Sequence, residues 1–475
     1  MAPAATPRDA GLSIALTGNM YFEHPISGYR DQGVLRAAAV LRDADLAISN
    51  LECAIGADEA WPAFGGGMGW SGTHMNAPTS MIDDLRFLGI DAVFGANNHT
   101  ADFGELGILT TIEALRAGGM PVAGIGPSLA EASRPCYLET PRGRVAVISA
   151  ADWGPRRLME LPFPWPAGYL PSDERPPFRS RPGVNLVRYD AVVHVDEPAF
   201  QQLRRISDAL DWGAAKIVRR MGGGRTETLV GPTLIDHEVD TETEFFFMGR
   251  KFVVGDKFRI STVPYREDLD RVFAAVREAR ERADLVVVGL HDQSHAGGVL
   301  DFIRILAHGC IDAGADLYVN HGGKGRGIEV YRGRPILYGQ TSFYLQSEES
   351  TRIPTEMLLR MGLPGEAMAA DFVAARQANE ARALAAGGRS PHSPRDQKFI
   401  QVVEFDRALA PREVRIHPIA VPRTGPRNEK RFPVLLEPGT PEWIAALDDA
   451  EARCRPFGTV VERRDGTGVV PLGLM

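Results

Sequence analysis

Five short apolar segments of this chain each end in a side chain that could do chemistry. They are LSIALTGN, ADLAISNLE, DAVFGANNH, ADLVVVGLH and ADLYVNH, which end at Asn19, Glu52, His99, His291 and His321. In an α/β sheet the carboxyl ends of the strands border one crevice where ligands bind. We therefore expect these five side chains to meet in one active site, although they come from distant parts of the chain.

Two of these junctions combine groups that could bind a metal. GANNHTADFG places an amide, Asn98, beside the imidazole of His99, and both can ligate a metal while the amide can hold a developing oxyanion. The alternative is that Asn98 caps a turn and His99 is a buried, hydrogen-bonded histidine. Glu52 follows a strand of nearly continuous apolar character, where a carboxylate is costly to bury without a cation or donor. Its alternative role is to cap the following loop or helix.

The last two junctions add acid and cationic groups. His291 opens HDQSHAGG with Asp292 beside it, an arrangement that suits a metal ligand and its neighbour, or a base with an orienting acid. His321 opens the Gly-rich NHGGKGRGIE, which carries Lys324 and Arg326. Glycines let the backbone approach a ligand, and the cations suit a carboxylate or phosphate; the alternative is a tight turn with an exposed Lys324. A phosphate-binding Walker motif is missing, so we expect no nucleotide cofactor.

These groups need a sheet to position them. From Gly11 to Trp153 apolar runs alternate with amphipathic stretches, a βαβα rhythm that indicates a parallel or mixed sheet with helices on its faces. Residues 155–182 are dense in Pro and aromatics and suit a lid or substrate wall. The alternation in KFIQVVEFDRALAPREVRIHPIAVP predicts a hairpin. We expect a flexible lead over residues 1–10, a catalytic core over 11–350 with the insert at 155–182, and residues 351–475 completing the same domain.

The composition of the chain argues against some classes of function. A net charge of −8 over 475 residues argues against a nucleic-acid surface, which needs a basic stripe. No apolar run approaches the roughly 20 residues of a membrane span. Four isolated cysteines without CxxC spacing suit a reducing cytosol better than a disulfide framework, so we expect a cytoplasmic protein. Nothing in the sequence specifies an oligomeric state.

The chain resembles the CapA family of poly-γ-glutamate capsule synthesis accessory proteins, whose fold is similar to that of calcineurin-like metallophosphoesterases. The matching segments lie between about Leu12 and Val470 and are DLAISNLE, GIDAVFGANNHTADFGELGILTTIEALRAGGMPVAGIG, ADLVVVGLH, IDAGADLYVNHGGKGRGIEVYRGRPILY and FGTVVERRDGTGVV. The resemblance implies an α/β fold, a four-layer α/β/β/α sandwich with its site at the carboxyl ends of the strands. It also implies that the family's metal-site positions are kept at Glu52, Asn98, His99, His291 and His321.

The departures from the family pattern concern the metal. Gly18-Asn19 stands where Gly-Asp is usual, and Lys324 lies near the place of the second histidine of a Gly-His-x-Pro-His element. Losing a bridging negative charge and gaining a cation both disfavour two dications side by side. We therefore expect at most one divalent metal, zinc or manganese, with an open position for catalysis; its ligands would be Glu52, His99, His291 and His321. A metal-free site with Lys324 as cation and a histidine as base is the alternative.

The leading hypothesis is an enzyme that hydrolyses a small or peptide-like amide. A carboxylate of the substrate would be held by Lys324 or Arg326, with Asn19 and Asp292 nearby, and the proton would be carried by His291 or His321. The other catalytic groups would be Lys324 and Asn98. The alternatives are a lyase acting on a small molecule, aromatic or not, and a non-catalytic accessory protein in poly-γ-glutamate synthesis. A phosphoesterase ranks below both.

Overall fold

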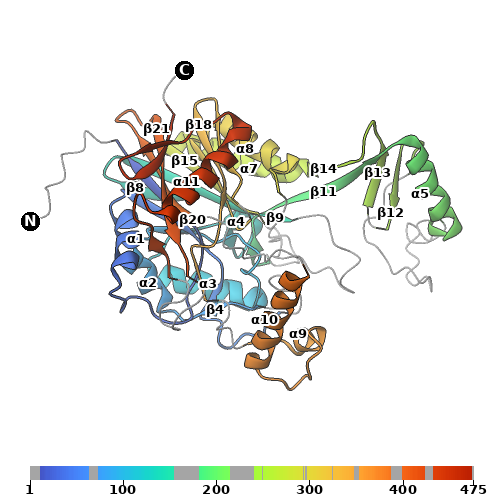
Figure 1. Cartoon of the computed structure of the whole chain (residues 1–475), viewed down its shortest axis with the longest axis horizontal. Coiled ribbons are helices and arrows are strands. Elements are labelled where there is room, and N and C mark those ends of the chain that lie inside the picture. The colour runs from blue at the N-terminus through green and yellow to red at the C-terminus, as the bar shows by residue number, and fades with distance from the viewer. Residues whose placement is uncertain are drawn as a thin grey trace, which may run out of the picture.

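The computed structural model describes eleven stretches of the chain: residues 11–63, 73–153, 181–213, 240–248, 250–292, 294, 297–323, 325–346, 352–386, 398–422 and 432–472. These residues form a mixed α/β fold with two ten-stranded sheets and two two-stranded pairs (Figure 1). The predicted α/β class is confirmed. All five apolar segments are strands: β1 (Ser13–Tyr21), β2 (Leu46–Leu51), β5 (Ala92–Phe94), β15 (Leu285–His291) and β16 (Leu317–His321).

The first sheet contains β1, β2 and β5 as parallel neighbours. Helices α1 (Gln32–Arg42) and α2 (Met81–Leu88) connect them, as parallel strands require. The predicted hairpin forms, and its first strand pairs antiparallel with β1. The sheet order is β23 (Glu462–Arg464), β24 (Thr467–Pro471), β21 (Pro411–Ala420), β20 (Lys398–Phe405), β1, β2, β5 and β6 (Val122–Ala123), with β19 (Tyr344–Leu345) on β1 and β22 (Val434–Leu435) on β21.

The second sheet is built around β9 (Gly143–Trp153), which runs parallel to β15. In the β15–β16 pair His291 and His321 are register partners, so the sheet itself sets the two imidazoles side by side. The sheet order is β12 (Glu244–Phe247), β13 (Arg250–Val254), β11 (Leu186–Val195), β9, β15, β16, β18 (Arg334–Gln340) and β17 (Gly327–Tyr331), with β14 (Arg259–Pro264) on β11 and β8 (Cys136–Thr140) on β9.

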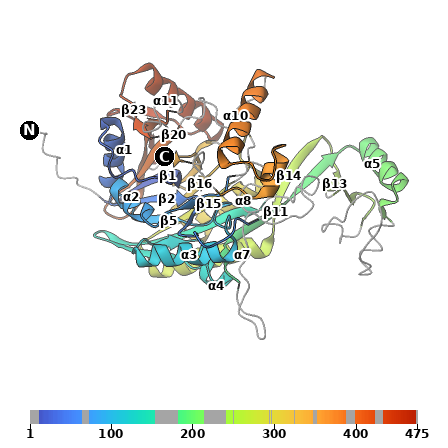
Figure 2. The same ribbon diagram turned by 90° about the horizontal axis from the view of Figure 1, so that it is seen from below.

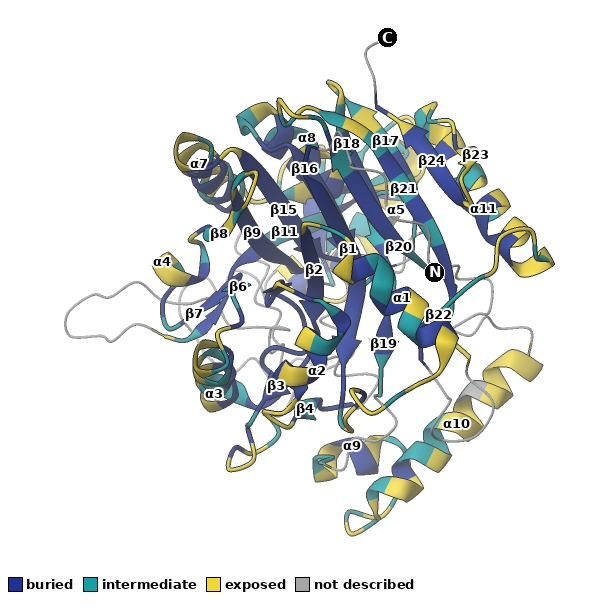
Figure 3. Ribbon diagram, turned by 90° about the vertical axis from the view of Figure 1, so that its left-hand side faces the viewer, coloured by how far each residue is buried: buried dark blue, intermediate teal, exposed yellow. Residues whose placement is uncertain are grey.

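One apolar core joins the two sheets. It includes Ile48 and Phe94 from the first sheet and Val147 and Val287 from the second. On its other face the first sheet packs against α1 and α2, and the second against α7 (Arg266–Arg282) and α8 (Asp301–Ala313). Strands β2 and β15 are buried at every position (Figure 3), as expected for strands covered on both faces.

The remaining described elements lie around this core. They are α3 (Gly104–Ala117), α4 (Leu129–Ala132), α9 (Thr355–Arg360), α10 (Ala369–Ala385), α11 (Pro441–Cys454), η1 (Arg455–Phe457), and the strand pairs β3 (Ala54–Ile55) with β4 (Asn76–Ala77) and β7 (Ile125–Gly126) with β10 (Gly183–Val184). None of the helices within the described stretches is long and apolar enough to cross a bilayer.

An arm projects from the second sheet. Helix α5 (Glu197–Ala209) lies with β12 and β13 at the far end of β11 (Figures 1 and 2). Its small apolar cluster contains Phe200, Trp212 and Phe245. The expected lead at 1–10 and all but the last two residues of the insert at 155–182 fall outside the described residues.

Candidate functional site

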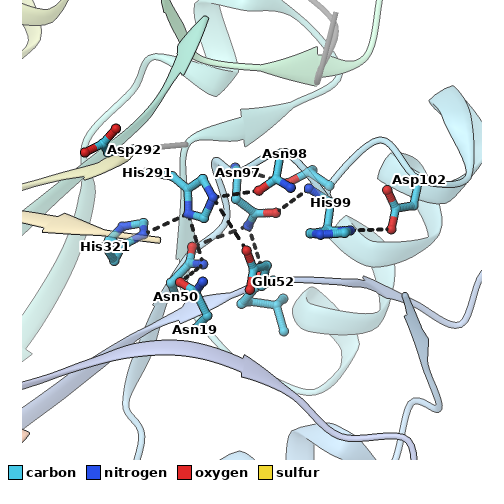
Figure 4. A network of polar contacts seen from close by, with 12 residues as sticks. Asn19, Asn50, Glu52, Asn97, Asn98, His99, Asp102, His291, Asp292 and His321 are labelled. Atoms are coloured by element: carbon cyan, nitrogen blue, oxygen red, sulfur yellow. Dashed lines mark hydrogen bonds and ion pairs between the residues drawn. The ribbon is translucent and has the colours of Figure 1, made fainter. Parts of the chain in front are cut away.

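The carboxyl ends of strands from both sheets deliver the expected polar side chains to one buried place (Figure 4). Asn19 is on β1, Glu52 follows β2, Asn98 lies in the turn after β5, and His291 and His321 end β15 and β16. Each is no more than 6% exposed. The candidate functional side chains therefore lie together at the edge where these strands end.

Three of these side chains converge on one point. The Nε2 atom of His291 lies 2.6 Å from Oδ1 of Asn98 and 3.6 Å from Oε1 of Glu52. Ligands of one tetrahedral ion at metal distances of about 2.1 Å lie roughly 3–3.5 Å from each other. The separation of 3.6 Å is close to that range, whereas the separation of 2.6 Å is that of a hydrogen bond. One nitrogen and two oxygen donors suit zinc or manganese.

The structure does not bring together the whole ligand set expected from the sequence, which was Glu52, His99, His291 and His321. Among the described residues, no three His, Cys, Asp or Glu side chains are grouped so that they could hold a metal ion. The convergent group includes the amide of Asn98 in place of a third such residue. His321 contacts His291 instead, and the ring of His99 pairs with Asp102.

His321 lies behind His291. Their Nδ1 atoms are 3.2 Å apart, and the ring of His321 stacks on Phe94 with centroids 5.0 Å apart. One of the two Nδ1 atoms must therefore carry the hydrogen, and this contact orients the His291 ring. Gly322 has φ of +98°, and a Cβ there would come within 2.6 Å of Cε1 of His291. The glycine predicted to let a ligand approach thus makes room for an imidazole.

Asn19 uses both ends of its amide. Its Oδ1 accepts a hydrogen bond from Asn50 Nδ2 at 2.9 Å, and its side chain is also hydrogen-bonded to the carboxylate of Glu52. An aspartate at this position would set a second negative charge beside Glu52 and could not donate to it. Asn19, in place of the Asp usual in the family pattern, therefore suits the neighbouring carboxylate of Glu52.

The turn after β5 separates two asparagines with different tasks. Asn97 Oδ1 accepts from the backbone N–H of His99 at 3.0 Å, and its Nδ2 donates to the carbonyl of Leu51 at 2.6 Å. Asn97 therefore caps the turn, the role considered above for Asn98. Asn98 is left to face His291.

His99 forms a pair with Asp102. The two meet at 2.8 Å between Nδ1 and Oδ2, and Asp102 also accepts from the backbone N–H of Met75 at 2.7 Å. Burial acts to lower the pKa of His99, but the charge and hydrogen bond of Asp102 outweigh it and raise that pKa. The charge of His99 lowers the pKa values of both Glu52 and His291.

Burial keeps the convergent group weakly charged. It raises the pKa of Glu52 to about 7 against the opposing effects of His99 and Asn19. It lowers the pKa of His291 well below its usual range, with His321 and His99 adding to the effect, and lowers that of His321 to about 3. The Glu52–His291 contact is therefore not an ion pair between two fully charged groups.

The cations expected to grip a substrate are placed differently. Arg326 is 5% exposed, forms an ion pair with Asp292, and donates to Ser294 Oγ at 2.8 Å. Asp292 also accepts from the backbone N–H of Ser294 at 2.7 Å. This pair braces the turn after β15, and Asp292 lies apart from Glu52 in Figure 4. Arg326 and Asp292 are buried against each other, and their role in substrate binding stays a prediction. Lys324 lies outside the described residues.

Two cations that the sequence interpretation missed border the site. The charge of Lys398, at the start of β20, acts on Glu52, and its Nζ donates to the carbonyl of Ser342 at 2.8 Å. The charge of Arg376, on α10, acts on His99. Asp102 was also missed, although a carboxylate three residues after a histidine in a turn was a usable signal. Lys398 and Arg376 left no local signal.

Two cavities differ in their relation to this group. One of about 290 Å³ is lined by His74 and Phe103, which neighbours Asp102, together with Tyr21 and Arg352. Another of about 740 Å³ lies at the opposite end of β1, near Ser13. Its lining includes Glu413, which forms ion pairs with both Arg415 and Arg464. The smaller cavity is the one beside the candidate chemistry.

One family model and several known proteins are similar to this chain. A family model described as "Bacterial capsule synthesis protein PGA_cap" matches residues 13–347. The "Uncharacterized protein y4sH" of Sinorhizobium fredii is 27% identical over 97% of this chain and 93% of its own length. A "Probable polyglutamine synthesis accessory protein" of Mycobacterium tuberculosis is 24% identical over 51% of this chain and 42% of its own. A crystal structure of a hypothetical protein from Thermus thermophilus aligns over 86% of this chain and 98% of that one, at 12% identity and a TM-score of 0.32.

Proposed function

The chain belongs to the family of the bacterial capsule synthesis protein PGA_cap, and on this premise we propose that it is a single-metal hydrolase of a small amide that bears a carboxylate. The observation that carries the proposal is the convergence of His291 Nε2, Asn98 Oδ1 and Glu52 Oε1 in a buried place. An adjoining histidine is oriented by a carboxylate. Metal-donor atoms beside an oriented acid–base group are the parts that hydrolysis needs.

Glu52, Asn98 and His291 would hold the ion, and His321 would orient His291 from behind. A divalent ion there would polarise the substrate carbonyl and activate water near neutral pH. A cation would also balance the charge of the buried Glu52 carboxylate, which the surrounding side chains balance only weakly. A ligand histidine fixed through its second nitrogen is the usual support for such a site.

His99 is assigned the proton transfer. Asp102 holds its Nδ1, which leaves Nε2 on the far side of the ring to give a proton to the departing amine. Asn98 has an amide nitrogen that can donate to an oxygen of the substrate. We assign the proton transfer to His99 and not to His291 or His321, which the sequence favoured. The rings of those two histidines contact each other.

The experiment is a substrate screen with metal analysis. Protein loaded with Zn²⁺ or Mn²⁺ is assayed on p-nitroanilides with and without a carboxylate, on p-nitrophenyl acetate and on p-nitrophenyl phosphate. We expect anilide turnover that chelator abolishes and that His99→Ala and His291→Ala each reduce at least a hundredfold. Product analysis in ¹⁸O-water separates hydrolysis, which incorporates the label, from a lyase reaction, which does not. Turnover that is unchanged in both variants would sink the proposal.

A non-catalytic role is the second candidate, because the Mycobacterium tuberculosis relative is named as an accessory protein. It predicts a stable complex with a ligase of glutamate polymers, no bound metal and no turnover. Affinity purification from the native host, followed by elemental analysis of the same sample, distinguishes the two candidates.

Two broader assignments accompany this proposal. We assign the two sheets and their outer helices to a four-layer α/β/β/α sandwich similar to the calcineurin-like metallophosphoesterase fold, since one core joins the sheets and helices cover the outer faces. We also retain the cytoplasmic location. All four cysteines are free thiols, as suits a reducing compartment, and cell fractionation would test it.

A further inference from the structure

The cavity of about 740 Å³ lies away from the candidate metal site. Ser13, the first residue of β1, lines it, and Asn19 lies near the other end of that strand, so the two are about 20 Å apart. Most of its other lining residues belong to β20, β21 and the turn between β23 and β24, beyond residue 347, where the family match ends. Its volume is within the range of ligand pockets, about 300–1,000 Å³.

Several of the charged side chains in this cavity are paired with one another. Arg415 forms an ion pair with Glu413 at 2.7 Å and lies 3.9 Å from Glu404. Arg464 forms an ion pair with Glu413 as well. These four side chains therefore balance one another within the wall of the cavity.

Three other lining side chains have no such partner. Within the described stretches, no hydrogen bond or ion pair engages the guanidinium of Arg412, the carboxylate of Asp465 or the imidazole of His417. Arg412 and Asp465 are exposed, and His417 is half-buried. Burial, with a further effect of Arg415, lowers the pKa of His417 to about 4, so its ring is neutral at pH 7 and offers one donor and one acceptor. The cavity therefore presents one cation, one anion and one neutral polar ring to a ligand.

The two unpaired charges lie at opposite ends of the β21–β24 pair. Asp465 is in the turn that leads into β24, and at the other end of β24 the N–H of Leu472 donates to the carbonyl of Arg412 at 2.7 Å. Because β21 runs antiparallel to β24, His417, which follows Arg412 along β21, lies toward the Asp465 end. Figure 3 shows the two strands side by side.

We propose that this cavity binds a short extended peptide with free ends, whose carboxylate contacts Arg412, whose ammonium group contacts Asp465 and whose backbone contacts His417. A guanidinium can bind a carboxylate through two parallel hydrogen bonds. The span from Arg412 to His417, about 17 Å along β21, corresponds to about five extended residues. Because the two charged side chains reach toward the ligand, a peptide of about four residues fits. The inference does not depend on the proposed hydrolysis.

The test measures peptide binding by calorimetry on the full chain, treated with chelator to prevent metal-dependent turnover. The probes are tetraalanine, N-acetyl-tetraalanine, which lacks the ammonium group, and tetraalanine amide, which lacks the carboxylate. We expect wild type to bind tetraalanine at least tenfold more tightly than either blocked peptide. Arg412→Gln should remove the preference over the amide and keep the preference over the acetylated peptide. Asp465→Asn should do the reverse.

The variants are chosen so that the fold is preserved. Asparagine tolerates the φ of +52° at Asp465. His417→Phe keeps an aromatic ring and removes both nitrogens, and the loss of one neutral hydrogen bond should weaken the binding of all three peptides about fivefold. Arg266→Gln, at a side chain 92% exposed on α7, is the matched control and should bind all three peptides as wild type does.

Four results would count against this site. No binding of tetraalanine to wild type at millimolar concentration would overturn the inference, and so would an unchanged preference for free ends in both Arg412→Gln and Asp465→Asn. A loss of preference in Arg266→Gln as large as in Arg412→Gln would overturn it too, because the effect would then be one of net charge. Wild-type affinity in His417→Phe would overturn the contact with the peptide backbone.

Discussion

Two buried carboxylates in this protein have opposite surroundings. Asp268, on α7 at the root of the arm, is fully buried and accepts hydrogen bonds from Arg188 Nε and Arg271 Nη1, each at 2.7 Å. These contacts lower its pKa although burial acts to raise it. Glu52 is 6% exposed, and burial raises its pKa to about 7. Its contact within the convergent group is the weakly basic His291 at 3.6 Å.

The difference separates a carboxylate that serves the fold from one that serves the site. Asp268 has its cations built into the chain, so its charge is balanced when the protein folds. In the proposed function, a bound cation would balance the charge of Glu52, with Asn98 and His291 as its other ligands. Four changes can break or sharpen this contrast.

The largest effect is expected at Asp268. Asp268→Asn leaves two arginines without their shared partner and should lower the free energy of unfolding by about 3 kcal/mol at pH 7. Because the pKa of Asp268 is lowered, its contribution is present above the unfolded value of about 3.9 and is lost as the pH falls through the folded pKa. Denaturant unfolding at pH 7 and pH 3 should therefore show a gap that shrinks in acid. Asp270→Asn, at a side chain 66% exposed, is the control; an equal loss there would remove the contrast.

The second change is at Glu52. Its pKa is raised from 4.5 to about 7, so chelator-treated wild type should lose stability as the pH rises from about 4.5 to about 7, by on the order of 2–3 kcal/mol. Glu52→Gln should lack this loss and be the more stable of the two above pH 7. Glu113→Gln, at a side chain 63% exposed, should behave as wild type. Parallel pH profiles of wild type and Glu52→Gln would contradict the assignment.

The third change removes the support behind His291. His321→Ala deletes the imidazole that contacts His291 Nδ1 at 3.2 Å. Loss of such a support costs about 10–100-fold in metal affinity, while Glu52, Asn98 and His291 all remain. Competition with a fluorescent zinc chelator measures this. A metal stoichiometry that falls to zero would instead make His321 a ligand itself.

The smallest effect is expected at Lys398 and has the opposite sign. Its charge acts on Glu52 and would repel a dication, so Lys398→Gln should strengthen metal binding by about two- to threefold. Lys257→Gln on the exposed arm should leave the affinity unchanged. Weaker binding in Lys398→Gln would mean that the lysine supports the ligand set.

Much of the fold could be predicted because the strands are continuous apolar runs with polar residues mainly at their ends. The five strand ends and the β20–β21 hairpin follow from that pattern. The sharing of one site by Glu52, Asn98 and His291 also follows from parallel strands ending at one edge.

The remaining site features depend on contacts that the pattern does not encode. The ion pair of Arg326 with Asp292 depends on a turn that brings the two side chains together. Nothing in the Gly-rich sequence around Arg326 indicates this pairing. Arg376 reaches the site through the placement of α10, about three hundred residues from the Thr73 that anchors it. The capping role of Asn97 over Asn98 depends on which side chain faces inward at one turn.

The central claim is that Glu52, Asn98 and His291 form a one-metal site. Calorimetric titration of chelator-treated protein with Zn²⁺ at pH 7.5 tests it directly, in wild type, Glu52→Gln and Asp268→Asn. The account predicts one ion per chain in wild type and in folded Asp268→Asn, and an affinity at least a hundredfold weaker in Glu52→Gln. Equal affinity in Glu52→Gln and wild type, or no binding to wild type, would contradict it.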